Sequence, residues 1–527
     1  MRGRSTIVLL LTALVAFAGS VVAVTLGAAP ALAAVEDDGA GCPVPGTGGL
    51  TANPRLPDPF RKFDGTRITS RSDWRCRRAE IKELAERHVY GDKPGKPASV
   101  TGTVSSSGIT VNVTHNGRSA SFSAGVQLPS GSGPFPAVIV VGGFGADTAT
   151  IRAAGAAVIS YDPLAVGREG TPRNNKQGAF YSIYGATSST GLLAAWAWGA
   201  SRIIDVVEQS GGTVLRADAL GVTGCSRYGK GAFAVGAFDQ RIALTMPIES
   251  GSAGVPILRG IPGESGAQPL SSAYGEQPWL GDAFSSFTGN PNTLPVDMHE
   301  VVAMVAPRGL FIMENPHVDW RAARSGSVSA LGGAEVYKAL GAGDNISYWS
   351  DVQDGTHCAA RPEWRTPLQQ HIQKFLLKTG NAAGTFRISS RKAGSLAEWR
   401  DWQTPVLSDG PSTPPTGGPT TPPPTTPPPA GAGCTATVAL NQWTGGFVAT
   451  IRVTAGAAPI GGWTVALTLG SGATITSAWN ANRSGNTGAA QFTNVAFNGS
   501  VAAGQSTEFG FQGTGSGAGL SPSCAAR

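Results

Sequence analysis

The chain reads LGVTGCSRYGK over residues 220–230, and this stretch decides the class of fold. An apolar run ends at Gly224, and Ser226 follows it directly before a helical pattern. A strand, a sharp turn that carries a serine, and a helix together form a nucleophile elbow. The second glycine is Gly229, one residue later than in the strict G-x-S-x-G pattern. We therefore predict a catalytic Ser226, against the alternative of an ordinary serine that caps a helix.

Strand-like and helical patterns alternate around this elbow. Apolar runs typical of buried strands occupy residues 135–141, 156–161, 242–246, 309–313 and 346–349. Helical patterns cover residues 189–209, 333–341 and 366–378. This alternation predicts an α/β fold with a mostly parallel sheet that helices cover on both faces. In such folds the active site lies at the carboxyl ends of the strands.

Residues 1–34 have the features of a secretory signal. Two arginines, Arg2 and Arg4, precede an apolar stretch over residues 7–26, and small residues follow at 31–34. We expect cleavage after Ala33 or Ala34 and a secreted, extracellular protein. The alternative is an uncleaved membrane anchor, which the Gly and Pro at the end of the apolar run disfavour. No later stretch is apolar over a membrane-spanning length, so we expect no membrane partner.

Composition excludes some classes of protein and marks a domain boundary. The 527 residues carry a formal net charge of +6, with 14% charged and 41% hydrophobic residues, which excludes a fully disordered chain. No basic run follows the N-terminus, so we expect no nucleic-acid partner. Pro and Thr dominate residues 411–429, and we predict an extended linker over 407–433. It separates a large domain, residues 35–406, from a tail over residues 434–524.

The tail has a different pattern from the large domain. It has almost no charge, and Thr, Gly, Ser and Val recur in short alternating runs, such as 447–454 and 463–469. This pattern predicts a C-terminal all-β sandwich domain. Cys434 and Cys524 stand at its two ends, so a disulfide between them would join the terminal strands.

The other four cysteines complete a set of three predicted disulfides, which an even count in an exported chain favours. Cys42 and Cys76 both lie in the N-terminal segment. That leaves Cys225 and Cys358, which directly adjoin Ser226 and a histidine at position 357. A disulfide holds its two Cα atoms about 5–6 Å apart. This bridge would therefore hold the histidine loop against the elbow.

A serine nucleophile needs a histidine base and an acid that orients it. We predict His357 as the base because it follows the strand-like run at 346–349, whereas His371 lies inside a helical pattern. Two acids compete, since Glu249 and Asp319 each follow a predicted strand and each preserves the order Ser, acid, His. Spacing alone leaves both open.

Several separated motifs resemble the glucuronoyl esterases, carbohydrate esterase family 15. They comprise GCSRYGK at 224–230, AWAWG at 195–199, SRIID at 201–205, ESGS at 249–252, EQPW at 276–279, NTLPVD at 292–297, APR at 306–308 and GTHC at 355–358. The resemblance covers the region from Cys42 to about Leu377. It implies an α/β-hydrolase three-layer sandwich and hydrolysis of esters between glucuronic acid branches of xylan and lignin alcohols.

The resemblance also implies roles for individual residues. It assigns Ser226 as nucleophile, His357 as base and Glu249 as acid, with Asp319 kept as an alternative. Arg227 is similar to the oxyanion-stabilising arginine of the family. Four further residues are implied in sugar binding: Lys230, Gln268, Glu276 and Trp320.

The tail resembles a family 2 carbohydrate-binding module. Trp443 and Trp479 match the aromatic platform that stacks on the glucose rings of cellulose, and Phe497 stands where the third aromatic is usually Trp. Trp463 matches the buried core tryptophan of the module. The resemblance thus implies a cellulose surface as a binding partner.

These observations favour a secreted two-domain serine esterase, a carboxylic ester hydrolase, anchored to cellulose. We expect no metal and no organic cofactor, a glucuronoxylan–lignin ester as substrate, and a monomer. Two alternatives are an acetyl-xylan esterase or other carbohydrate esterase on the same fold, and a cellulose-binding protein whose hydrolase domain is inert.

Overall fold

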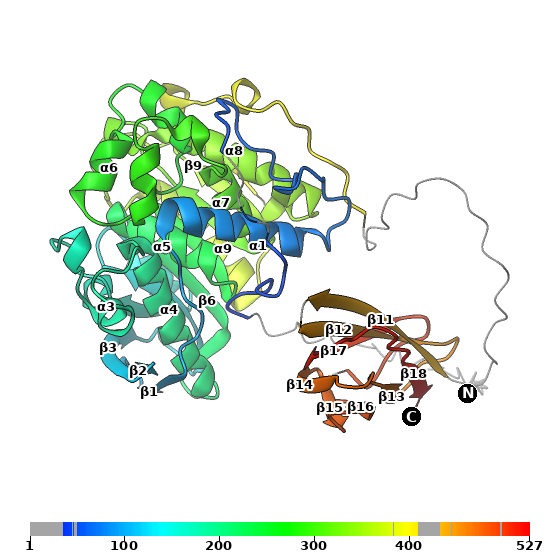
Figure 1. Cartoon of the computed structure of the whole chain (residues 1–527). Coiled ribbons are helices and arrows are strands. Elements are labelled where there is room, and N and C mark those ends of the chain that lie inside the picture. Colours follow the sequence, from blue (N-terminus) through cyan, green and yellow to red (C-terminus); the bar gives the residue numbers. More distant parts are fainter. Residues whose placement is uncertain are drawn as a thin grey trace, which may run out of the picture. The chain divides into compact units, whose positions relative to one another are not determined.

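A computed structural model describes residues 35–44, 46, 50–382, 384–408, 433–443, 445–495 and 498–526. The predicted signal peptide, 1–34, lies outside the described residues, as does nearly all of the predicted linker, 407–433. The described residues form two compact units, 35–408 and 433–526, and each is considered by itself (Figure 1). Across these residues, no helix combines the length and the apolar character that crossing a membrane requires.

The first unit is built on a ten-stranded sheet in the order β1-β2-β3-β5-β4-β6-β7-β8-β9-β10. The strands are β1 (Ser99–Val104), β2 (Gly108–His115), β3 (Arg118–Gln127), β4 (Phe135–Val141), β5 (Ala157–Tyr161), β6 (Leu215–Cys225), β7 (Ile242–Ile248), β8 (Gly309–Met313), β9 (Ile346–Trp349) and β10 (Phe386–Arg387). All neighbours from β5 to β10 in this order are parallel. The predicted parallel sheet is therefore confirmed, with its strand ends within a few residues of the predicted ones.

Helices cover both faces of this sheet. They are α1 (Trp74–Ala85), α2 (Thr148–Ala153), α3 (Ala179–Tyr184), α4 (Leu192–Gln209), α5 (Arg227–Phe238), α6 (Leu270–Glu276), α7 (Met298–Met304), α8 (Ala323–Ala339) and α9 (Pro362–Ile372), which a π-helical turn (Gln373–Leu377) extends. Ala137 and Ile139 of β4 share one core with α1, α4, α5, α7 and α8. Val138 and Val140 share the opposite core with α2 and α9. Successive side chains of a strand face opposite sides, so the unit has three layers.

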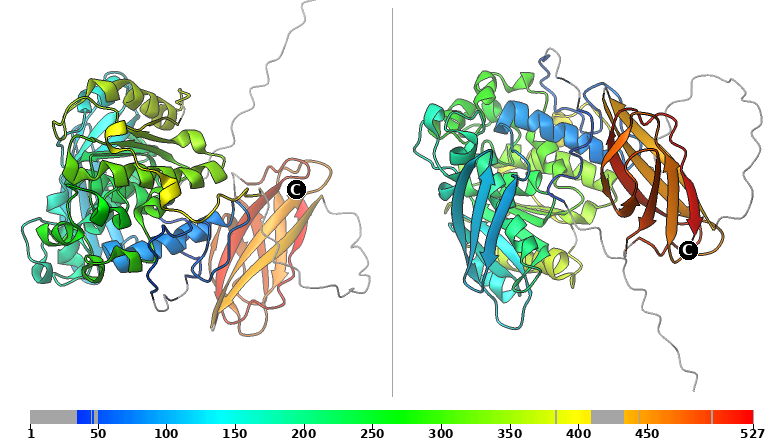
Figure 2. Two further views of the ribbon diagram at one scale, coloured as in Figure 1. Left: turned by 90° about the horizontal axis from the view of Figure 1, so that it is seen from above. Right: turned by 60° about the horizontal axis from the view of Figure 1, so that its bottom comes forward.

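Three antiparallel strands extend one edge of the sheet, and they were not predicted. The strands β1, β2 and β3 form a meander, and β3 pairs antiparallel with β5 (Figure 2). In β2 every second residue from Ile109 to Val113 is buried. Such alternation is typical of an antiparallel strand with one face exposed, so the sequence did carry this signal.

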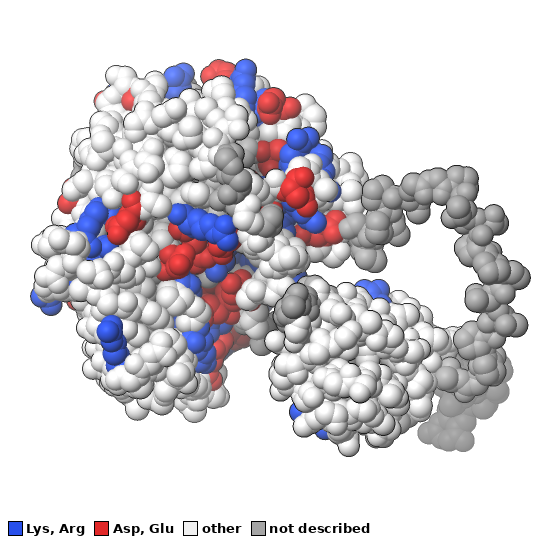
Figure 3. Space-filling model, in the orientation of Figure 1, with Lys and Arg blue, Asp and Glu red and all other residues white. Residues whose placement is uncertain are grey.

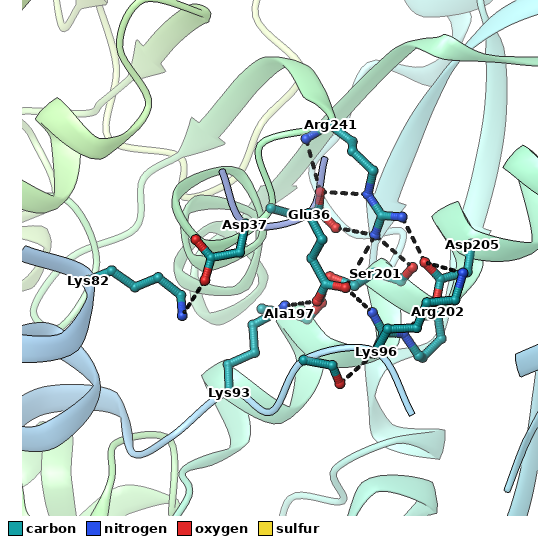
Figure 4. A network of polar contacts seen from close by, with 12 residues as sticks. Glu36, Asp37, Lys82, Lys93, Lys96, Ala197, Ser201, Arg202, Asp205 and Arg241 are labelled. Atoms are coloured by element: carbon teal, nitrogen blue, oxygen red, sulfur yellow. Dashed lines mark hydrogen bonds and ion pairs between the residues drawn. The ribbon is translucent and has the colours of Figure 1, made fainter. Parts of the chain in front are cut away.

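The N-terminal segment is fixed to α4 by ion pairs. Glu36 forms ion pairs with Lys93 and Arg202 and lies 3.7 Å from Arg241 (Figure 4). Arg241 also contacts Asp205, at 2.7 Å. Buried charges need such compensation, because removal from water costs several kcal/mol per ion. The network therefore holds the beginning of the described chain on the helical layer.

The second unit is a sandwich of two antiparallel four-stranded sheets (Figure 2). One sheet contains β11 (Cys434–Trp443), β12 (Gly446–Ala455), β17 (Ser506–Thr514) and β14 (Thr474–Trp479), and the other β15 (Ala481–Ser484), β16 (Ala489–Asn494), β13 (Trp463–Thr468) and β18 (Ser523–Ala526). Trp463 is fully buried and stacks on Phe509, so its predicted core position is confirmed. The face of this unit that Figure 3 presents is almost free of charged side chains.

Candidate active site

Ser226 occupies a strained turn between β6 and α5. Its φ of +61° is unusual for a residue with a side chain, and its N–H donates to the Ile248 carbonyl at 2.9 Å. Such strain is typical of a nucleophile elbow. A Cβ at Gly224 would lie 2.5 Å from the Tyr228 carbonyl oxygen, and one at Gly229 would lie 2.4 Å from the Ile248 carbonyl oxygen. Both glycines are therefore required by the close approach of backbone atoms.

His357 and Glu249 form a hydrogen-bonded pair. The Nδ1 of His357 lies 2.5 Å from Oε2 of Glu249, and the backbone N–H of Cys358 donates to the same oxygen at 3.0 Å. Glu249 directly follows β7 and is fully buried, with a φ of +44°. A buried carboxylate on Nδ1 leaves the lone pair of Nε2 available to accept a proton.

Asp319, the alternative acid, lies away from the histidine. Its side chain is 54% exposed and pairs with Lys392 at 3.0 Å. This ion pair holds the pKa of the Asp319 carboxyl below its ordinary value. Of the two candidates it is therefore Glu249 that contacts the imidazole, because the loop after β8 turns Asp319 toward solvent.

The structure contains all three predicted disulfides. Cys225 and Cys358 are bonded with their Cα atoms 5.8 Å apart, which joins the elbow to the loop that carries His357. Cys42 pairs with Cys76, and Cys434 pairs with Cys524 between the first and last strands of the sandwich.

A cavity of about 760 Å³ opens over Ser226 and His357. Its walls include four residues of the predicted site, Arg227, Gln268, Glu276 and Trp320. Two further wall residues, Tyr228 and Arg321, were not predicted. The cavity lies at the carboxyl ends of β6 and β7, as expected for a parallel α/β sheet. Its volume lies within the range of small-molecule binding sites.

Arg227 follows the serine and stands at the cavity wall. Its Nη1 donates to Glu169 at 3.0 Å, and the other oxygen of Glu169 accepts from the indole N–H of Trp279 at 2.6 Å. The side chain of Arg227 remains 42% exposed. Glu169 therefore holds a guanidinium next to Ser226 while leaving part of it open to a ligand.

Lys230 lies beneath the cavity and is not among the residues that line it. Its Nζ donates to the carbonyl oxygens of Ser250 and Ser252, both at 2.6 Å, and the side chain is 1% exposed. Burial, and then the nearby Arg321, lower the pKa of this ammonium well below its ordinary value. In its protonated form Lys230 has a third N–H, for which no acceptor is seen among the described residues, and its predicted sugar contact stays a prediction.

Gln268, Glu276 and Trp320 do face the cavity. The amide of Gln268 donates to the carboxylate of Glu276 at 2.7 Å, which fixes two polar groups side by side. Trp320 is 47% exposed, and its ring lies 5.9 Å from that of His357. An exposed aromatic ring next to paired polar groups is typical of the lining of a small-molecule site.

Two buried residues that follow β8 were not among the predicted site residues. Arg321 places Nη1 3.4 Å from Oγ of Ser226, and Glu314 is fully buried directly after β8. Burial, and then Glu249, raise the pKa of Glu314 well above its ordinary value. The position of Glu314 directly after the apolar run 309–313 was a readable signal, but the prediction for the acid after this strand was Asp319, further along the same loop.

One cluster has the composition of a metal site. Cys225, Glu249, His357 and Cys358 bring their ligand atoms within 4.8 Å of one another. The two sulfur atoms are bonded to each other, so neither is a thiolate donor. These residues therefore do not fit a metal ion as a ligand set.

Comparisons with known proteins agree with this geometry. The family described as "Glucuronyl esterase, fungi" matches residues 111–341, and "Cellulose binding domain" matches residues 434–526. The 4-O-methyl-glucuronoyl methylesterase of Hypocrea jecorina is 36% identical over 370 residues, which cover 69% of this chain and 79% of the relative. That of Neurospora crassa is 37% identical, covering 70% and 93%. The chain belongs to the glucuronoyl esterase family. This glucuronoyl esterase is a carboxylic ester hydrolase with a C-terminal cellulose-binding module.

Solved structures of glucuronoyl esterases share its first unit. The enzyme of Sporotrichum thermophile is 36% identical with a TM-score of 0.66, covering 70% of this chain and all of the other. A serine-to-alanine variant of that enzyme, solved in complex with methyl 4-O-methyl-β-D-glucopyranuronate, is 34% identical with the same TM-score and coverage. The α/β-hydrolase fold predicted for this esterase is thereby confirmed.

The predicted cellulose platform lies partly outside the described residues. Trp443 ends β11 and Trp479 ends β14, and the structure does not describe either side chain. Phe497 lies outside the described residues. The roles of these three aromatics stay predictions.

Proposed function

We propose that this chain is a secreted serine esterase that cleaves the esters between glucuronic acid side chains of glucuronoxylan, with or without 4-O-methylation, and lignin alcohols. One observation carries the proposal: the buried Glu249 accepts from His357 on the rim of a cavity whose floor is the strained Ser226. The uronate ester bound by the Sporotrichum thermophile variant supports the choice of substrate. The three disulfides support export to an oxidising compartment. We propose that the enzyme acts as a monomer.

In the first half of the reaction, Oγ of Ser226 attacks the carbonyl carbon of the ester, and Nε2 of His357 takes the hydroxyl proton. Glu249 stabilises the imidazolium that forms, since its Oε2 already accepts from Nδ1. The C–O bond to the alcohol then breaks, and the imidazolium returns the proton to the leaving oxygen. The glucuronoyl group remains esterified to Ser226.

The charge that develops on the carbonyl oxygen requires positive partners. We propose that the backbone N–H of Arg227 and its partly exposed guanidinium supply them. In the second half a water molecule, deprotonated by His357, attacks the acyl-enzyme and releases glucuronate and free Ser226. Every step uses protein groups and water alone.

Substrate binding is assigned to the polar wall opposite the serine. We propose that Gln268 and Glu276 bind ring hydroxyls as a pair, and that the exposed ring of Trp320 closes the pocket over the sugar. Lys230 would contribute its remaining N–H from below. This arrangement would select a pyranuronate over an acetyl group, which has no hydroxyls to bind.

A direct test compares benzyl glucuronate ester with acetyl-xylan as substrates for the wild type and for Ser226→Ala. We expect turnover of the glucuronate ester alone, and its loss in the variant. Activity that survives the substitution would overturn the mechanism. Release of acetate as the main reaction would instead favour the acetyl-xylan esterase alternative, and an inert wild type would favour the binding-protein alternative.

We further propose that the C-terminal module anchors the enzyme to cellulose through Trp443, Trp479 and Phe497. The nearly uncharged sandwich suits a neutral, crystalline polysaccharide (Figure 3). The test is a cellulose pull-down of the full chain and of Trp443→Ala. A matched control is Leu440→Ala, which removes an apolar side chain that is 40% exposed on the same strand. Equal retention of both variants would contradict the proposal.

A further inference from the structure

A second hollow lies at the amino-terminal ends of the parallel strands, whereas Ser226 lies at their carboxyl-terminal ends. Its volume is about 460 Å³, and its walls include Arg308, directly before β8, and Gln240, just before β7. The cavity over Ser226 lies at the other ends of these parallel strands. A strand of seven residues, such as β7, spans about 20 Å, so the two openings are separate sites.

Positive charge dominates the second hollow. Arg71, Arg75 and Arg78 line it from α1 and the turn before α1, and Arg308 lines it from the sheet (α1 is labelled in Figure 1). Residues three apart on a helix share a face, which is why Arg75 and Arg78 converge, and Arg71 joins them from the turn before α1. Of the described residues that line the hollow, Asp38 alone is acidic, and it pairs with Arg75 at 2.7 Å.

Arg78 is built into the wall, and only part of its hydrogen-bonding capacity is used. The residue is 7% exposed, and its Nη2 donates to the Asp38 carbonyl oxygen at 2.6 Å. Among the described residues no hydrogen bond reaches its Nε or Nη1, and neither atom is sealed from solvent. These N–H groups therefore remain available to a ligand in the hollow.

The arginines also repel one another. Burial, and then Arg308, lower the pKa of Arg78 to about 9. Arg308 bonds to four carbonyl oxygens and to no carboxylate, and burial lowers its pKa to about 10. Asp38 and Asp37 oppose the shift at Arg78, but among the described residues neither Arg78 nor Arg308 bonds to a carboxylate, which favours the binding of an anion.

The rest of the hollow is apolar. Trp74, Ala306, Pro307 and Leu340 line it beside the arginines. A phosphate or sulfate ion would leave this surface without a partner, whereas the C–H face of a sugar ring would cover it. Arginine is also the side chain best suited to a carboxylate, which it binds with two parallel hydrogen bonds.

We propose that this hollow is a second anion-binding site, which takes a sugar-sized carboxylate such as a free uronate, with Arg78 as its principal donor. Glucuronate is therefore the probe. None of the proposed contacts lines the cavity over Ser226, so changes at Arg78 or Asp38 report on the hollow alone. The outcome is thus independent of the proposed esterase function.

The experiment is a calorimetric titration of the full chain with sodium glucuronate at low ionic strength. We expect one class of sites to weaken by about tenfold or more in Arg78→Gln, because a charge-assisted hydrogen bond is lost. Asp38→Asn should tighten the same class, since it removes the competing carboxylate and releases Arg75. The matched control is Arg216→Gln, which removes the same charge from β6, where Arg216 pairs with the exposed Asp218.

The ligand class is tested with two further probes. Glucose, which lacks the carboxylate, should not bind this class of sites, and sulfate, which lacks the sugar body, should bind about tenfold more weakly than glucuronate. Equal binding of sulfate would overturn the assignment to a sugar. Unchanged glucuronate binding in a folded Arg78→Gln variant would overturn the site. If Arg78→Gln does not fold, the titration of Asp38→Asn tests the proposal instead. Glucuronate binding to Asp38→Asn that is unchanged or weaker than in the wild type would overturn the proposal.

Discussion

At the scale of single residues, the candidate site depends on which carboxyl group reaches the imidazole. Oε2 of Glu249 lies 2.5 Å from His357, whereas Asp319 is exposed and paired with Lys392. We predict that Glu249→Gln lowers kcat by roughly a thousandfold to ten-thousandfold, because an amide cannot stabilise the imidazolium. Asp319→Asn should stay within about threefold of the wild type, which is less than a single hydrogen bond contributes. Steady-state kinetics on benzyl glucuronate would reveal the reverse order if the assignment were wrong.

Glu314, directly after β8, is a second buried carboxyl group close to Glu249, but we expect its substitution to have little effect on kcat. Burial and the adjacent Glu249 raise the pKa of Glu314 well above its ordinary value, which favours the neutral acid. Glu314→Gln mimics this neutral acid with an uncharged group of the same shape. We predict a kcat within about threefold of the wild type, since no ionic interaction is lost. A loss as large as that of Glu249→Gln would show that Glu314 acts as a carboxylate.

At the scale of elements, the elbow depends on how closely α5 approaches β7. A Cβ at Gly229 would lie 2.4 Å from a backbone oxygen of Ile248, which cannot move without displacing the strand. We predict that Gly229→Ala lowers the free energy of unfolding by about 2 kcal/mol or more. It should also lower kcat by about a hundredfold, because Ser226 shifts with the helix.

Urea unfolding and steady-state kinetics of the same preparations test both effects. The matched control is Gly289→Ala, where an added Cβ meets no atom within 4 Å. A Gly229→Ala variant as stable and as active as this control would contradict the explanation.

Elements were predicted well where their pattern is local and continuous. The run at 309–313 coincides with β8, and 135–141 with β4, because buried parallel strands are uniformly apolar. The predicted helix 333–341 covers only the end of α8, Ala323–Ala339, whose first turns are rich in Ser and Gly. Those residues are weak helix formers, and packing against α7 rather than propensity makes them helical.

At the scale of the whole molecule, stability depends on buried groups that must remain uncharged. His371 of α9 stacks on Phe311, and its ring nitrogens contact the Pro367 carbonyl oxygen and the Ser347 hydroxyl. Burial lowers its pKa to about 4. The unfolded chain has the ordinary value of about 6.5 and takes up a proton that the folded protein excludes. Between these two values, lowering the pH therefore lowers the free energy of unfolding.

This sign leads to a prediction for His371→Gln. Between pH 7 and pH 5 the contribution of His371 to the free energy of unfolding falls by about 2 kcal/mol. The variant lacks this contribution, so the stability of the wild type relative to the variant should fall by the same amount over that interval. Urea unfolding at the two pH values measures the difference. Parallel pH profiles of the two proteins would show that His371 is not excluded from protonation.

The sequence by itself determined the three-layer fold, the sandwich, the elbow and the three cysteine pairs. Each of these follows from short-range patterns or from residues that directly adjoin one another, such as Cys225 beside Ser226. Spacing left Glu249 and Asp319 open and the family resemblance favoured Glu249, but only the tertiary structure shows that Glu249 contacts His357. It alone also decided that Lys230 is buried and that the arginines of α1 converge with Arg308. The reason is physical: side chains far apart in sequence meet through loop conformations and helix packing, which a linear pattern does not specify.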